Sequence, residues 1–145
     1  MSSVYIPKTL RRRVAEQARY RCGYCLTREA ITGTPMEMDH IFPSSLGGPT
    51  IENNLWLACG PCNEHKGSRV TAQDPRGGQV VRLFNPRLDV WEEHFEWIEG
   101  GLRIICEHRT CINRWRDYYR GLCRFSESCQ EYSKGNRIYR SGSWI

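Results

Sequence analysis

A repeat of apolar positions near the start of the chain predicts a helix over residues 8–21. Leu10, Val14 and Ala18 recur every four residues and therefore lie on one face of such a helix. The arginines of the segment occupy mostly the other sides. That basic side is either a solvated surface or a face that contacts phosphate groups.

The middle of the chain predicts a strand, a long loop, a second strand and a helix. MEMDHI (36–41) alternates between apolar and polar residues, as a half-buried strand does. PSSLGGPTIENN (43–54) is rich in turn residues and predicts a loop, and LWLAC (55–59) predicts the second strand. Pro61 lies at a favourable first-turn position for a helix that continues to about Val70.

The remaining pattern is weaker. VVRLF (80–84) predicts a brief strand, and the aromatic residues of 91–98 predict a packed amphipathic stretch. WIEGGLRI (97–104) predicts a hairpin, because the paired glycines allow a tight turn. Residues beyond 105 are rich in Arg, Tyr, Ser and Cys and poor in aliphatic residues, which favours a poorly ordered tail over a basic-aromatic segment that binds nucleic acid.

Length and charge change this picture only a little. The 145 residues indicate a small domain with an extension, and we expect residues 1–73 to form the domain and 74–145 the extension, poorly defined after about 105. A unit as small as the first usually needs a staple such as a bound metal. The formal net charge of +5 and a pI near 8.9 fit nucleic acid binding without requiring it.

Eight cysteines in so short a chain need an explanation. The first residues contain no apolar segment typical of a secretory signal, and no run approaches the roughly 18 apolar residues of a membrane helix. We therefore expect a cytoplasmic protein with no membrane partner. In that setting, paired Cys-x-x-Cys motifs indicate a metal site rather than disulfides.

Two such motifs supply four thiolates, the donor set of a closed structural Zn²⁺ site. The alternative is two independent redox-active or buried cysteine pairs. Two matched motifs in one short chain favour zinc. The gap between them is longer than in a usual zinc ribbon, which is explained if the metal holds together the ends of a loop that carries the working residues. The remaining four cysteines lack this spacing and are expected to be free thiols. The predicted zinc ligands are Cys22, Cys25, Cys59 and Cys62.

The segment between the motifs carries a second set of polar residues. Asp39 offers a hard oxygen ligand for Mg²⁺ or Mn²⁺, and the neighbouring His40 can take a proton from water near neutral pH. Asn54 can hold the imidazole through a hydrogen bond from its side chain or backbone. Asn63 can be the second protein ligand, which leaves coordination positions for phosphate oxygens and water.

Basic residues near this segment are candidates for phosphate contacts. Lys66 and Arg69 follow Asn63 on the predicted helix, and Arg11 and Arg12 lie on the N-terminal helix. For all of them a solvated surface is the alternative, because exposed cations usually contribute little on their own.

The motifs Cys-x-x-Cys, Asp-His-Ile-x-Pro-x-Ser-x-Gly-Gly, Asn-Leu and Cys-x-x-Cys-Asn-x-x-Lys-Gly, which together cover residues 22–67, resemble the zinc-containing form of the HNH endonuclease family. The resemblance implies His40 as general base, Asn54 as the Asn that orients it, Asp39 as the metal-binding acid and Asn63 at a third position that many members fill with His. It implies an α+β fold, a ββα-metal finger with a four-cysteine zinc staple, an N-terminal helix and a C-terminal extension. LFNPRLDVWEEHFEW (83–97) also resembles a downstream block of a bacterial subgroup, notably cyanobacterial members.

The resemblance further implies hydrolysis of DNA phosphodiester bonds with one divalent metal, Mg²⁺ or Mn²⁺, besides the structural Zn²⁺, and products with 5′-phosphate and 3′-hydroxyl ends. DNA is then the partner, and no small-molecule cofactor is expected. One alternative is a zinc-stabilised module that binds nucleic acid without cutting it. Another is a zinc-stabilised scaffold that binds protein through the Trp-rich segment 91–97.

Overall fold

The computed structural model describes residues 5–73, 78–101 and 103–106. The chain divides into two compact units. The first comprises Met1–Thr71 and Arg82–Asp89, and the second comprises Ala72–Val81 and Val90–Ile145. Within the described ranges, no helix is long and apolar enough to cross a membrane.

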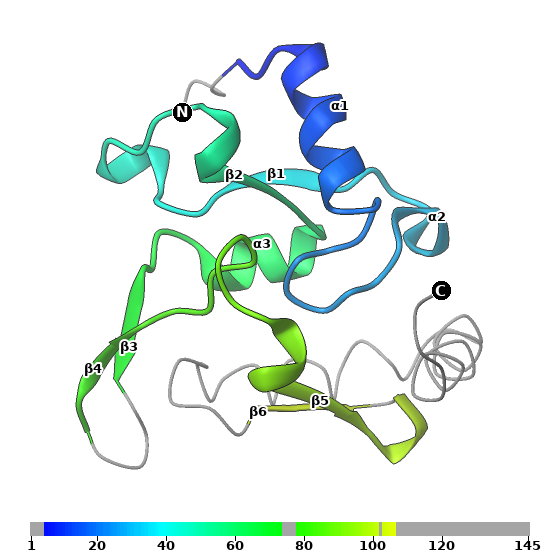
Figure 1. The fold of residues 1–145 in the computed structure, drawn as a ribbon, viewed down its shortest axis with the longest axis vertical. Coiled ribbons are helices and arrows are strands. Elements are labelled where there is room, and N and C mark those ends of the chain that lie inside the picture. Colours follow the sequence, from blue (N-terminus) through cyan, green and yellow to red (C-terminus); the bar gives the residue numbers. More distant parts are fainter. Residues whose placement is uncertain (1–4, 74–77, 102, 107–145) are drawn as a thin grey trace. The chain divides into compact units, whose positions relative to one another are not determined.

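The first unit is built around an antiparallel hairpin with helices on both sides. Figure 1 shows this hairpin between α1 and α3. Its register sets Asp39 opposite Trp56 and His40 opposite Leu55. This strand, strand, helix order confirms the predicted α+β class. The elements are α1 (Lys8–Gln17), α2 (Glu29–Thr32), β1 (Glu37–His40), β2 (Leu55–Ala58) and α3 (Gly60–Lys66), with 3-10 turns at Ser44–Leu46 and Glu52–Asn54.

The α1 helix packs its apolar face against β2, with Val14 fully buried. It ends at Gln17, before the predicted end at Arg21. The reason is local, because Arg19 and Tyr20 have φ values of 51° and 54°, which a right-handed helix cannot contain. The segment between the first Cys-x-x-Cys motif and β1 contains one helical turn, α2, that was not predicted.

The long connection between β1 and β2 turns sharply at two glycines. Gly47 has a φ of 89°, in the left-handed region that glycine adopts without strain. Gly48 lies against the backbone, and a Cβ there would be 1.9 Å from the carbonyl oxygen of Phe42. The Gly-Gly pair therefore allows the connection to fold back on the end of β1.

The segment Arg82–Asp89 belongs to the first unit, although it lies beyond the predicted boundary at residue 73. Phe84 packs edge-on against Tyr24, with ring centroids 6.4 Å apart. Arg87 stacks over the ring of Trp56 and donates a hydrogen bond of 2.9 Å to the carbonyl oxygen of Leu55. The segment thus covers the outer part of the hairpin.

Two further hairpins follow. β3 (Thr71–Gln73) pairs with β4 (Val80–Arg82), and β5 (Phe95–Ile98) pairs antiparallel with β6 (Arg103–Cys106). The predicted strand at 80–84 is confirmed over Val80–Arg82, and the predicted hairpin at 97–104 is confirmed with strands that extend from Phe95 to Cys106. β3 was not predicted, because its three residues are mostly exposed and carry no apolar alternation. The prediction for the tail, and those for Cys111, Cys123 and Cys129, lie outside the described residues.

Candidate functional site

The four cysteines of the two Cys-x-x-Cys motifs meet at one buried point. Their sulfur atoms all lie within 4.8 Å of one another, and the Sγ atoms of Cys25 and Cys59 are 3.8 Å apart. Four sulfurs bound at about 2.3 Å to a central Zn²⁺ would be about 3.8 Å apart. The donors and their spacing therefore fit a tetrahedral metal site formed by Cys22, Cys25, Cys59 and Cys62.

The backbone explains why the two motifs meet. The first motif follows α1 and is joined to β2 by a hydrogen bond of 2.8 Å from the Gly23 amide to the Leu57 carbonyl oxygen. The second motif begins where β2 ends, with Cys59 as the residue that precedes α3. A metal bound to all four thiolates would thus join the end of α1 to the junction between β2 and α3.

The electrostatics of the cluster fit a cation. Burial raises the pKa values of the Cys22 and Cys62 thiols well above their ordinary value. Hydrogen bonds from the other cysteines lower the pKa of Cys25. Buried thiolates packed this closely would repel one another, and a bound zinc ion would supply the positive charge that stabilises them.

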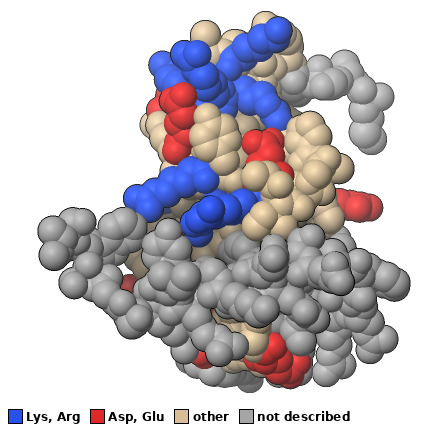
Figure 2. Space-filling model, turned by 90° about the vertical axis from the view of Figure 1, so that its right-hand side faces the viewer, with Lys and Arg blue, Asp and Glu red and all other residues tan. Residues whose placement is uncertain are grey.

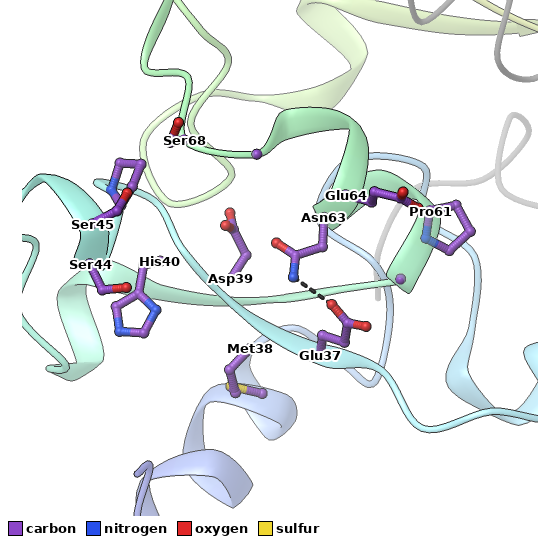
Figure 3. A pocket seen from close by; sticks show the side chains of 13 residues that line it. Glu37, Met38, Asp39, His40, Ser44, Ser45, Pro61, Asn63, Glu64 and Ser68 are labelled. Atoms are coloured by element: carbon purple, nitrogen blue, oxygen red, sulfur yellow. Dashed lines mark hydrogen bonds between the residues drawn. The ribbon is translucent and has the colours of Figure 1, made fainter. Parts of the chain in front are cut away.

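A pocket of about 870 Å³ lies beside this cluster, between β1, the turn after it and α3. Asp39, His40 and Asn63 all line it (Figure 3). The candidate site residues on β1 and on α3 therefore line the same cavity. Asn54, the fourth candidate, does not line it.

Asp39 is almost completely buried, with 3% of its surface exposed. Its Oδ1 accepts a hydrogen bond of 2.9 Å from Lys66 Nζ, and its Oδ2 accepts one of 2.5 Å from the Tyr24 hydroxyl. Burial raises the pKa of Asp39, and the Lys66 ammonium opposes that rise. Tyr24 was missed in the sequence, where its only signal is its position between Cys22 and Cys25.

Lys66, one of the expected phosphate contacts, points inward in this structure. The side chain is buried rather than exposed, and its ammonium bonds to Asp39 and, at 2.9 Å, to the carbonyl oxygen of His40. Sequence position alone could not reveal this, because the ammonium crosses from α3 to β1. Lys66 thus supplies a positive charge at the carboxylate that is expected to bind a divalent cation.

Lys66→Met should destabilise the first unit by about 3 kcal/mol, since it leaves the Asp39 carboxylate buried without its counter-charge. Urea denaturation of the zinc-loaded protein measures the change. Combining Lys66→Met with Asp39→Asn removes both charges, and the double variant should be more stable than Lys66→Met alone. Equal or lower stability of the double variant would show that the ion pair does not account for the loss.

His40 is half-buried at the end of β1, and its Nε2 lies 2.9 Å from the Thr50 hydroxyl oxygen. Burial lowers the pKa of His40, Lys66 acts in the same direction, and Asp39 opposes both. The lowered pKa favours the neutral imidazole, which is the form that accepts a proton. Figure 3 shows the side chains of His40 and Asp39 pointing in different directions, as expected for neighbours on a strand.

Asn54 holds the loop rather than the imidazole. Its Oδ1 accepts a hydrogen bond of 2.8 Å from the Phe42 amide, and its Nδ2 donates to the carbonyl oxygens of Phe42 and Pro49, each at 2.9 Å. The backbone carbonyl of Asn54 bonds to the Ile41 amide. The expected hydrogen bond from Asn54 to the His40 ring is thus replaced by one with Thr50, a residue that no sequence motif singles out.

Asn63 lies on α3 and reaches toward β1. Its Nδ2 donates a hydrogen bond of 2.5 Å to Glu37 Oε2. Figure 3 shows the carboxamide oxygen of Asn63 turned toward Asp39. Two oxygen donors from different elements therefore line the same pocket, and oxygen is the ligand type that a hard divalent cation prefers.

The other residues expected to contact phosphate differ in whether their side chains are bonded to other groups of the protein. Arg69 bonds back to the carbonyl oxygens of His65 and Lys66, and Arg11 bonds to that of Met36. Arg12 is largely exposed and makes an ion pair of 3.7 Å with Glu16. Figure 2 shows Lys and Arg side chains gathered in the upper part of one face, with acidic side chains among them. Phosphate contacts by these three arginines stay a prediction.

Comparison with known proteins identifies the segment that holds the site. Residues 22–69 match the family model described as HNH endonuclease. This segment contains the cysteine cluster, both strands of the central hairpin and α3. No curated protein and no solved structure shows a significant match to the chain.

Proposed function

Because residues 22–69 form an HNH domain, of a nuclease family, we propose that the protein is an endonuclease that hydrolyses DNA phosphodiester bonds with a divalent metal and a histidine base. One observation carries the proposal. A proton acceptor, His40, and two oxygen donors, Asp39 and Asn63, line the same cavity. A water molecule and a divalent cation would both have complementary residues there, and the cation would in turn hold a phosphate oxygen.

In this proposal His40 takes a proton from the attacking water. When Nε2 carries the ring hydrogen and donates it to Thr50 Oγ1, Nδ1 keeps its lone pair and can accept that proton. The lowered pKa of His40 favours the unprotonated ring that such a base requires. Thr50 holds the ring, and Asn54 indirectly supports it by holding the loop on which Thr50 lies.

Asp39 and Asn63 would hold the divalent cation, Mg²⁺ or Mn²⁺. When bound, such an ion supplies charge stabilisation at a phosphate oxygen and at the leaving 3′ oxygen. Tyr24 holds the second carboxylate oxygen of Asp39, which fixes the side chain against β1. The four cysteines would bind Zn²⁺, and they position Tyr24 and α3 without contacting the DNA substrate.

A second candidate function is a zinc-stabilised module that binds nucleic acid without cutting it. The observation that favours it is the ion pair between Lys66 and Asp39, because an ammonium already neutralises the carboxylate. The two proposals differ in one result. An enzyme cuts DNA when the metal is added, whereas the module only retains DNA in a manner that weakens as salt is raised.

Supercoiled plasmid incubated with the zinc-loaded protein should be nicked or linearised when Mg²⁺ or Mn²⁺ is added, and should stay intact without them. Dialysis to remove loosely bound ions, followed by Mn²⁺, should restore cutting, whereas added Zn²⁺ should not. EDTA in the reaction should stop it. Plasmid retention without any cutting under these conditions would contradict the enzyme and support the binding module.

A further inference from the structure

Glu37 is a pocket residue to which the mechanism above assigns no role. It lies on β1 two residues before Asp39, so both side chains leave the same face of the strand. Its Oε2 accepts the 2.5 Å hydrogen bond from Asn63 Nδ2. Glu37 on β1 is therefore the hydrogen-bond partner of Asn63, the proposed metal ligand on α3.

The bond fixes which end of the Asn63 amide faces the pocket. A carboxylate only accepts hydrogen bonds, so it pairs with the NH₂ end of a carboxamide and not with the oxygen. The oxygen must then point away from Glu37, and Figure 3 shows it turned toward Asp39. A reversed amide would set two oxygen atoms against each other at Glu37 and would present NH₂ to the cation.

We propose that Glu37 is a positioning residue that orients the Asn63 carboxamide so that its oxygen faces the divalent cation. The inference rests on the proposed function, since it assumes that Asn63 binds the metal. Glu37 acts through Asn63, and its contribution is the selection of one amide orientation out of two. Asparagine at this position needs such a partner, whereas a carboxylate, with two equivalent oxygens, does not.

Two substitutions separate the hydrogen bond from the charge. Glu37→Ala removes the acceptor and the negative charge together. Glu37→Gln removes the same charge but keeps an oxygen that can accept from Asn63 Nδ2. Glu37→Ala should weaken Mn²⁺ binding by about 10-fold, the usual loss for a group that orients a metal ligand. Glu37→Gln should retain most of the affinity.

Asn63→Asp provides an independent test. An aspartate presents an oxygen whichever way its carboxylate rotates, so it has no orientation to lose. In the Asn63→Asp background, Glu37→Ala should therefore leave Mn²⁺ affinity unchanged or raise it by removing a neighbouring negative charge. The difference between the two backgrounds measures the coupling of Glu37 to the amide.

Calorimetric titration of the zinc-loaded protein with Mn²⁺, without DNA, measures these affinities, and thermal denaturation checks that each variant is folded. Equal weakening by Glu37→Ala and Glu37→Gln would overturn the orientation role in favour of a charge effect. Unchanged binding in Glu37→Ala, with Asn63→Ala still weaker, would also overturn it while leaving the metal site intact. If Asn63→Ala binds Mn²⁺ as well as the parent, the assignment of Asn63 as a ligand is wrong and the role of Glu37 is wrong with it, whereas the plasmid assay tests the proposed function separately.

Discussion

His40→Ala should reduce plasmid cutting by about 10²–10⁴-fold, the usual contribution of a general base. The loss is expected in the chemical step, because the substitution removes the proton acceptor and leaves Asp39 and Asn63 in place. The rate of nicking at saturating protein, with Mg²⁺ or Mn²⁺ in excess, measures it. Zinc content and Mn²⁺ affinity should stay close to those of the parent.

Two further variants make the result specific. Ser45→Ala changes an exposed residue of the same pocket to which no chemistry is assigned, and it should cut at the parental rate. Thr50→Val removes the hydroxyl at Nε2 and keeps the imidazole, so its rate should lie between those of the parent and His40→Ala. Parental cutting by a folded His40→Ala protein would refute the assignment of the base.

The central hairpin and α3 were predictable because each has a strong local signal. MEMDHI alternates between apolar and polar residues, and Met36 and Met38 are accordingly buried while Glu37 is exposed. Asp39 on the polar face is buried as well, because Lys66 and Tyr24 cover it. The meeting of the cysteines was also predictable, since two matched Cys-x-x-Cys motifs in one short chain are typical of a shared metal site. In each case the signal lies within a few residues.

The contacts that complete the site were not predictable, because they join residues far apart in the sequence. In the sequence Lys66 is one of several basic residues, and only the packing of α3 on β1 buries it against Asp39. Thr50 takes the role expected of Asn54, since the loop after Phe42 brings the hydroxyl, and not the amide, to the His40 ring. The sequence pattern around a residue does not show which distant side chain will contact it in the folded protein.

Tyr24 connects the two predicted sites physically. Its backbone lies between two zinc-ligand candidates, and its hydroxyl bonds to the acid proposed to bind the catalytic cation. Burial and the neighbouring Asp39 raise the pKa of Tyr24 well above its ordinary value, so the hydroxyl stays protonated and donates. Distortion of the cysteine cluster should therefore disturb Asp39 directly, through one hydrogen bond.

Cys62→Ser should unfold the first unit and abolish both zinc binding and cutting. Structural zinc sites of small domains bind with about 10–16 kcal/mol, which equals or exceeds the roughly 5–15 kcal/mol of stability of a typical domain. Cys62 is fully buried at the start of α3, and a serine there supplies a poor ligand for zinc. Metal analysis, circular dichroism and the plasmid assay should all report the loss.

Cys123→Ser is the matched control, because its cysteine lies outside both Cys-x-x-Cys motifs and the tetrad is complete without it. This control should keep one zinc per chain, the parental spectrum and the parental cutting rate. Retention of zinc and structure by Cys62→Ser would mean that the cysteines do not form one metal site. A folded Cys62→Ser protein without zinc would instead show that hydrophobic packing around Leu55 and Val14 is enough to fold the first unit. The role left to the metal would then be to hold Tyr24 against Asp39.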